Sequence, residues 1–251
     1  MGIPTNLLLT ALPTFVPSFL GSCLKRSTLL AGHVLYNVHD PIRRVYFPID
    51  AIVSLRIPLL NGHTVETAMV GRDGVLGALA AFGAKRSSCR AVVQISGDCL
   101  YTEVDALTSA VVKFPELRSL IISHEEALLS HIHQSAACNA THHLESRLAR
   151  RLLRAVDLRG SDELLLTQEY LAEMLGARRA TVTLIAQNFQ NAGMIKYTRG
   201  HIKICDTVKL QMAACECYRV IKSNYEALLP SPDILSALSL TDRLSLLNTS
   251  H

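Results

Sequence analysis

Residues 166–204, LTQEYLAEMLGARRATVTLIAQNFQNAGMIKYTRGHIKI, decide the fold of this 251-residue chain. Thr167 can cap a short helix over residues 168–175, and Glu169 falls in its first turn, where the helix dipole favours a carboxylate. Gly176 allows a sharp turn, because glycine tolerates positive φ. A second helix is expected to begin near Arg178 and to end at Gly193. The stretch therefore predicts two helices joined by a tight turn.

The second of these helices has two unlike faces. At 100° per residue its apolar side chains gather in one narrow arc, which should be buried, while the opposite arc is small, polar or methyl-bearing and is headed by two arginines. The major groove of DNA admits one helix, whose N-terminal end meets the base edges. The outward face therefore fits a recognition helix. The expected buried residues are Val182, Ile185, Ala186 and Phe189, and the expected outward ones are Arg178, Arg179, Ala180, Thr183, Leu184, Gln187 and Asn191.

The charge of this region agrees with that interpretation. Between Gly176 and Cys205 there are five basic residues and no acidic one, a footprint that suits phosphate. Residues 194–204 predict two short strands around Arg199-Gly200, a basic hairpin that could touch the phosphates beside the groove. The alternative is a helical hairpin packed inside a larger α-domain, which would leave the acid-free window unexplained.

The sequence pattern before this region is typical of a β-domain. From Gly32 to Val104, strand-like runs recur about every ten residues, which predicts a sandwich or barrel. Asn61-Gly62 predicts a hairpin turn, and the glycine-rich segment 71–90 predicts a loop with a brief helix. The runs are VLYNV, RRVYFPI, AIVSLRIPLL, TVETAMV, AVVQIS and CLYTEV.

After Pro115 the pattern changes to helix. A stripe from Leu117 to Cys138 has the alternating spacing of four and three residues that is typical of a coiled-coil seam. We expect a homodimer seam here, with packing against the β-domain as the alternative. In the following helix the arginines 147, 150, 151 and 154 are expected to form a solvated face. The candidate dimer residues are Leu117, Ile121, His124, Leu128, His131 and Ser135.

Residues 166–204 resemble the winged helix-turn-helix of the Crp/Fnr transcriptional regulators, and the order of textures from about Leu24 to Asp206 is similar to theirs. The resemblance implies an α+β fold: an N-terminal double-stranded β-helix (jelly-roll-like) domain, a long dimerisation helix and a C-terminal winged helix-turn-helix domain. The expected boundaries are 1–113 for the β-roll effector domain with an N-terminal helical segment, 114–140 for the dimerisation helix, 141–228 for the DNA-binding domain with a C-terminal helix, and 229–251 for a flexible tail. The expected function is transcriptional regulation by a homodimer on two-fold symmetric double-stranded DNA, with RNA polymerase as a further partner.

The resemblance also suggests individual contacts. The family's recognition pattern Arg-Glu-Thr-Val corresponds to Arg179-Ala180-Thr181-Val182, which keeps the arginine that pairs with guanine. Ala180 replaces a base-reading glutamate and Leu184 a second base-reading arginine, so the preferred half-site should differ from the family's commonest one. The expected DNA-binding residues are Thr167, Gln168, Arg178, Arg179, Ala180, Thr181, Thr183, Leu184, Gln187 and Arg199.

The same comparison places a candidate effector site in the β-domain. The family's Gly-Glu-Leu and Arg-Ser motif aligns with Gly77-Ala78-Leu79 and Arg86-Ser87, without the carboxylate that accepts from a ribose hydroxyl. Losing that acceptor should cost about 1–3 kcal/mol, so ordinary cAMP is not the expected effector. The candidates Gly77, Leu79, Arg86 and Ser87 could hold another small anion, or Arg86 could be a surface arginine.

No metal or cofactor is expected. Only Cys23 lies near the N-terminus, too few thiols for an iron–sulfur cluster, and the pairs His131/His133 and His142/His143 do not share a helix face as residues four apart would. Cys215 and Cys217 are expected to be packed helical thiols. His124 and His131 could meet their symmetry mates across the seam and make it pH-sensitive.

Two other classes of protein remain as alternatives, both without DNA binding. A cupin-like metal enzyme would need His-x-His and then Glu, but Gly62-His63-Thr64-Val65-Glu66 has Val65 in place of the second histidine, so no enzyme is expected. A small-molecule-binding β-roll protein is the other alternative. Seven cysteines without a CxxC pair, and an apolar segment 3–24 broken by three prolines, predict a cytoplasmic protein with neither signal peptide nor membrane helix.

Overall fold

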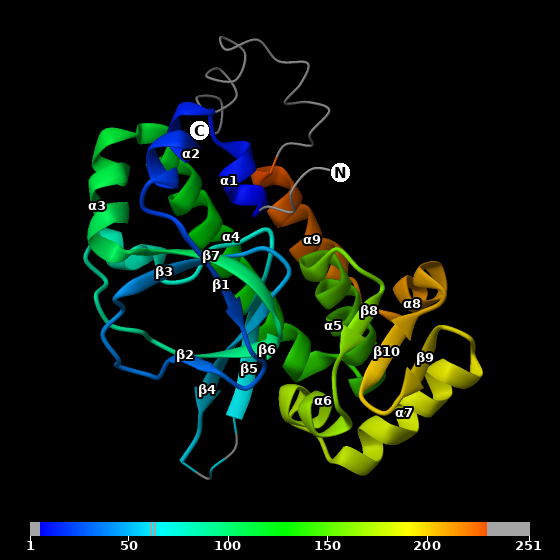
Figure 1. The fold of residues 1–251 in the computed structure, drawn as a ribbon. Helices are drawn as coiled ribbons and strands as arrows, with labels where there is room; N and C mark the ends of the chain where they lie inside the picture. The colour runs from blue at the N-terminus through cyan, green and yellow to red at the C-terminus, as the bar shows by residue number, and fades with distance from the viewer. Residues whose placement is uncertain (1–5, 61, 63, 230–251) are drawn as a thin grey trace.

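The computed structural model describes residues 6–60, 62 and 64–229, and Figure 1 shows their arrangement. A β-roll and its covering helices form one half of the molecule, and a helix-rich module with a small sheet forms the other. The long helix α4 (Pro115–Thr141) belongs to the first half and α5 (Leu144–Arg159) leads into the second. The predicted fold class is confirmed. Of the predicted tail 229–251, all but the first residue lies outside the described residues.

The β-roll consists of two antiparallel sheets. One has the order β1 (Lys25–Leu29), β7 (Gly97–Glu103), β3 (Arg44–Pro48). The other has the order β2 (Val34–Tyr36), β6 (Arg90–Ile95), β4 (Ile52–Pro58), β5 (Thr64–Val70). The predicted hairpin is confirmed by the antiparallel pairing of β4 with β5, and η1 (Ala78–Phe82) is the predicted brief helix.

Strand β1 was not predicted, because its sequence KRSTL is mostly polar and shows no apolar alternation. Its position depends on pairing with β7, in which Lys25 lies opposite Tyr101 and Leu29 opposite Gly97. Three helices cover this end of the roll: α1 (Leu7–Ala11), α2 (Phe15–Gly21) and α3 (Val104–Lys113). Their apolar side chains form one core with Leu117 and Ile121 of α4.

The buried stripe of α4 faces its own chain. Leu117, Ile121, His124, His131 and Ser135 are all at most 3% exposed within a single chain. Their neighbours are the roll and the C-terminal helix α9 (Cys217–Leu228), which runs along α4 (Figure 1). The expectation of a dimer seam at these residues is therefore wrong for this conformation. Its periodicity correctly marked a buried stripe, but periodicity does not say which chain covers it.

The two stripe histidines meet a tyrosine of α9 instead of symmetry mates. His124 and His131 each pack edge-on against Tyr225, with ring centroids 6.2 and 6.1 Å apart. Leu128, the sixth candidate, packs against the core of the roll. Burial, reinforced by the arginines of α5, lowers the pKa of His131 well below its usual value. The expected pH-sensitive seam is thus replaced by a histidine kept neutral inside the protomer.

Helix α5 is buried around most of its circumference. Its leucines pack into the core of the C-terminal module, while Arg150, Arg151 and Arg154 are only 1–2% exposed. The expected solvated arginine face is wrong, because α5 lies between the two halves of the molecule. Arg151 pairs with Glu66 at 2.5 Å and Arg154 with Asp73 at 2.7 Å.

The C-terminal module contains the predicted helix pair α6 (Gln168–Leu175) and α7 (Arg179–Asn191), followed by the hairpin β9 (Ile195–Thr198) and β10 (His201–Ile204). A third strand, β8 (Glu163–Leu165), pairs with β10 and was not predicted, because three residues carry too little pattern. Helix α8 (Thr207–Ala213) follows the hairpin. None of the helices within the described residues is long and apolar enough to cross a membrane.

Candidate nucleic-acid interface

The turn between α6 and α7 is fixed by its capping residues. The Thr167 side chain caps α6 by accepting a hydrogen bond from the backbone N–H of Tyr170 at 3.3 Å. Gly176 ends α6 with φ +61°, in the left-handed region that suits glycine. Arg178 is the N-cap of α7 and has an extended backbone. These local choices set the angle at which α7 leaves the turn.

Helix α7 presents the face that the sequence predicted. Its apolar arc of Val182, Ile185, Ala186 and Phe189 is at most 8% exposed and packs into the module's core. On the other side Leu184 is 58% exposed, although it is a large apolar side chain. The remaining outward residues are exposed, except Thr183, which is half-buried: Arg178, Arg179, Ala180, Thr181, Gln187 and Asn191.

Two contacts from α6 hold the start of this face. The Thr183 hydroxyl lies 2.8 Å from Gln168 Oε1 and 2.9 Å from the Arg179 carbonyl oxygen. Arg179 forms an ion pair with Glu169, and both side chains are more than 60% exposed. Such an exposed pair contributes at most about 1 kcal/mol, so a nucleic acid can displace Glu169. Sequence reasoning missed this pairing.

The hairpin after α7 is also formed as predicted. Arg199 and Gly200 occupy the turn with φ +47° and +84°, and the Arg199 and Lys196 side chains are exposed. Lys203, in contrast, lies 3.4 Å from Glu163 and 4.0 Å from Asp162, which adjoin β10 because β8 joins the sheet. The segment between Gly176 and Cys205 contains no acidic residue, but in the folded chain Asp162 and Glu163 lie beside its C-terminal end.

Two of the candidate effector residues, Arg86 and Ser87, form hydrogen bonds within the β-roll. Arg86 donates to the His39 carbonyl oxygen at 2.8 Å, and the Ser87 hydroxyl donates to that of Cys89 at 2.7 Å. Gly77 has φ +78° at the start of η1, and Leu79 is 43% exposed. Two cavities in the described part of the chain lie elsewhere, one between α1, α5 and α9 and the other between α8 and α9.

A cupin-like metal site is not assembled from the described residues. Glu66 is 3% exposed, with one carboxylate oxygen bound by Arg151 and the other accepting from Ser54 at 2.6 Å. Both oxygens are thus engaged, and Arg151 supplies the positive charge that a metal would supply. The other candidate, His63, lies outside the described residues.

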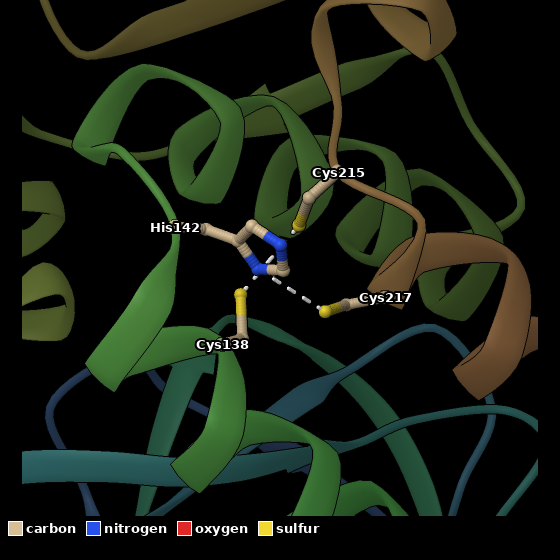
Figure 2. Close-up of side chains that lie close together, drawn as sticks. All are labelled: Cys138, His142, Cys215 and Cys217. Carbon is tan, nitrogen blue, oxygen red and sulfur yellow. Dashed lines mark hydrogen bonds between the residues drawn. The ribbon is translucent and has the colours of Figure 1, made fainter.

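One cluster was missed altogether. Cys215 and Cys217 are buried, as expected of packed thiols, but they also meet Cys138 and His142 in space (Figure 2). Cys138 and Cys215 are 77 positions apart, so no short motif signals the cluster. A hydrogen bond from Cys215 lowers the pKa of the Cys138 thiol to about 4, and the same bond raises that of Cys215.

The chain is similar in sequence to known regulators. Residues 146–213 match the model of the Crp-like helix-turn-helix domain. A CRP-like cAMP-activated global transcriptional regulator of Mycobacterium tuberculosis is 24% identical over 192 residues, which cover 73% of this chain and 85% of that protein. A global nitrogen regulator of Synechocystis is 25% identical over 180 residues, 68% of this chain and 80% of that one.

Solved structures share the fold. FixK2 from Bradyrhizobium japonicum superposes with a TM-score of 0.66 at 15% identity, covering 76% of this chain and 98% of its own. A CRP/FNR-family transcriptional regulator from Thermus thermophilus superposes with a TM-score of 0.60 at 25% identity, covering 76% and 98%. The arrangement of a β-roll, a long helix and a helix-turn-helix module is therefore shared with these two proteins.

Proposed function

We propose that the chain is a DNA-binding transcription regulator of the Crp/Fnr type, whose helix α7 enters the major groove and reads the operator. The observation that carries this proposal is the outward face of α7. It is free of the protein's own core, narrow enough for the groove, and headed by two arginines.

The residues of this face divide into base readers and phosphate binders. Arg179 is placed to bind guanine O6 and N7 with its two guanidinium nitrogens, once it leaves Glu169. Ala180 and Leu184 offer only apolar contact, which suits the C5-methyl group of thymine. Thr183 and Gln187 complete the base-reading face. The backbone phosphates are assigned to Thr167, Gln168, Arg178, Thr181 and Arg199.

We propose that the protein acts as a homodimer, joined by the face of α4 that its own chain leaves uncovered. Ile122 and Leu129 are 47% and 51% exposed and lie seven positions apart, the spacing that keeps side chains on one stripe of a helix. Glu126 and His133 extend the same exposed surface. The buried stripe of Leu117, Ile121, His124, Leu128, His131 and Ser135 then supports this surface from behind.

The proposed role as a transcription regulator also suggests an effector and a protein partner. Arg86 is exposed and could bind a small anion, whereas the carboxylate that would accept from a ribose is absent beside Leu79. RNA polymerase is the expected protein partner of a regulator at a promoter. We assign the chain no catalytic activity, and a bacterial cytoplasm is the compartment in which it would meet DNA.

The salt dependence of DNA binding tests the proposal. The association constant of the purified chain for a duplex should fall steeply between 50 and 200 mM salt, because each phosphate contact releases a counterion. For six to ten contacts the loss of affinity is roughly 10³–10⁵-fold. Removing one phosphate contact with Arg199→Ala should reduce the slope of log K against log salt by about 1. A binding constant that does not change with salt would contradict the proposal.

A further inference from the structure

A cluster of four metal-binding side chains lies where the end of α4 meets the connection between α8 and α9. Cys138 is near the C-terminal end of α4 and His142 follows it by one helical turn, while Cys215 and Cys217 flank the start of α9. Figure 2 shows the imidazole and the three sulfur atoms pointing toward one another. We propose that these four residues bind one Zn²⁺ ion in a closed tetrahedral site that fastens α9 to α4.

The spacing of the ligand atoms fits this ion. The four atoms all lie within 4.8 Å of one another. Cys138 Sγ is 3.5 Å from Cys215 Sγ, and Cys217 Sγ is 3.5 Å from His142 Nδ1. With Zn–S of about 2.3 Å and Zn–N of about 2.0–2.1 Å, a tetrahedron places sulfurs about 3.8 Å apart and sulfur and nitrogen about 3.5 Å apart. Binding therefore needs only small side-chain adjustments.

The ligand types select zinc among the common divalent cations. Three thiolates and an imidazole are soft or borderline ligands, whereas Mg²⁺ and Ca²⁺ prefer oxygen. Four protein ligands leave no open position for water, which is typical of structural zinc sites. Cys138 and Cys217 are fully buried, and His142 is partly exposed on the solvent side, where an ion could enter.

Contacts behind the ligands support the assignment independently. His142 directs Nδ1 toward Cys217, and its other nitrogen, Nε2, lies 3.1 Å from Glu216 Oε1. A carboxylate on the far nitrogen is the usual means of orienting a metal-bound histidine. Gln134 Nε2 also donates to Cys217 Sγ at 3.1 Å, a contact that favours a thiolate.

The charge of the surroundings matches a zinc thiolate complex. Three thiolates and one Zn²⁺ ion carry a net charge of −1, which a buried site must balance. Arg150 is 1% exposed, its Nε and Nη2 have no hydrogen-bond partner among the described residues, and its positive charge acts on Cys138. Arg147 is half-buried beside Cys138 and Cys215. Two arginines thus surround a site where negative charge is expected.

Zinc would join parts of the chain that are distant in sequence. Cys215 and Cys217 follow residue 213, where the match to the Crp-like helix-turn-helix domain ends. The site therefore combines the end of the long helix with a segment beyond the matched domain, and it would hold α9 over the buried stripe of α4. Zinc binding does not depend on the proposed function as a DNA-binding regulator. Only an effect of zinc on operator affinity would rest on that proposed function.

Metal content and cobalt substitution test the site on the full chain. The protein, purified under reducing conditions, should contain one zinc ion per chain. Replacement by Co²⁺ should give the visible ligand-field bands of a tetrahedral site and near-ultraviolet thiolate-to-cobalt bands. Cys217→Ser, Cys215→Ser and His142→Ala should lose these bands. The matched controls Cys205→Ser and His143→Ala, both exposed residues outside the cluster, should keep them.

Two further variants distinguish loss of a ligand from loss of folding. His142→Cys retains four ligands and should bind Co²⁺ with stronger thiolate bands, and Glu216→Gln should bind roughly 10–100-fold more weakly. Wild-type protein without thiolate-to-cobalt bands would overturn the proposal, as would bands that persist in Cys217→Ser. The proposal would also be overturned if metal-free protein contained a Cys138–Cys215 disulfide and, after reduction of that disulfide, still did not take up zinc. Because these readouts involve no DNA, their failure is distinct from failure of the operator proposal.

Discussion

We propose Arg179 as the side chain on which sequence preference most depends. It is exposed, lies in the first turn of α7 and is held in place by Glu169. Ala180 and Leu184 cannot donate hydrogen bonds, so Arg179 is the base-facing group of α7 best suited to distinguish guanine from the other bases. Arg199 is expected to act differently, because its position on the hairpin suits a contact with backbone phosphate.

We predict that Arg179→Ala costs about 1–3 kcal/mol per half-site and removes the preference for one guanine. Affinities for the operator and for variants substituted at each position would show this. Arg199→Ala is the matched control, since removing a phosphate contact should weaken binding to all sequences alike. If Arg179→Ala also weakened every sequence equally, Arg179 would be a phosphate contact and the assignment would be wrong.

His131 should make the folded state sensitive to acid. Arg150, Arg151 and Arg154 of α5 and Tyr225 of α9 face it, and its pKa is lowered well below 6.5. Well above pH 6.5 the histidine is neutral in both the native and the unfolded state and contributes no pH dependence. As the pH falls below that value, the unfolded chain takes up a proton that the native state does not, so the free energy of unfolding falls.

Urea unfolding at pH 7.5 and 5.5 would measure this contribution. Wild-type protein should lose about 1 kcal/mol more stability than His131→Gln over this interval. His133→Gln, an exposed histidine two positions along the same helix, should behave as the wild type does. Equal losses in all three proteins would show that His131 takes up its proton in the native state.

Among the elements, α5 lies between the two halves of the molecule and forms a buried ion pair with the roll. Arg151 and Glu66 are at most 3% exposed, so their ion pair has been removed from water, and Ser54 satisfies the second oxygen of Glu66. Removing one member of such a pair leaves a buried charge without compensation, which costs far more than the pair contributes. Exposed pairs such as Arg26–Asp98 behave differently, because solvent screens them.

Arg151→Met should therefore lower the free energy of unfolding by about 3–5 kcal/mol. Arg26→Met, the control, should cost less than about 1 kcal/mol. Adding Glu66→Gln to Arg151→Met should recover part of the loss, because the uncompensated carboxylate is then removed. These values can be measured by denaturant unfolding; equal effects of the two arginine substitutions would contradict the buried-pair account.

The sequence predicted elements better than it predicted their neighbours. Six of the seven roll strands and the α6–α7 pair follow from short-range patterns, and the arc from Val182 to Phe189 was predicted residue by residue. Strands β1 and β8 were missed, because pairing with other strands, not their own pattern, holds them in place. A burial pattern also does not identify its partner, so the α4 stripe and the α5 arginines were misinterpreted. The zinc-ligand cluster was not predicted, because Cys138 and His142 meet Cys215 and Cys217 only in the folded chain.

At the scale of the whole molecule, polar contacts join the roll and the DNA-binding module beside an apolar core that they share. Arg56 of β4 pairs with Glu173 of α6 at 3.0 Å and stacks on Tyr170, and the Thr64 hydroxyl donates to Glu173 at 2.6 Å. These contacts hold the side of α6 that faces the roll. The recognition face of α7 is left exposed (Figure 1). A ligand that moved the roll strands would act on α6 through Arg56 and Thr64.

Selection of bound sequences from random duplex DNA by the purified wild-type chain tests the central claim most directly, namely that α7 of two protomers reads DNA. The account predicts enrichment of a two-fold symmetric site, with half-site centres about one helical turn apart and one conserved guanine in each half that disappears when Arg179→Ala protein is used. The absence of any enriched sequence, or the same enriched sequence with both proteins, would contradict it.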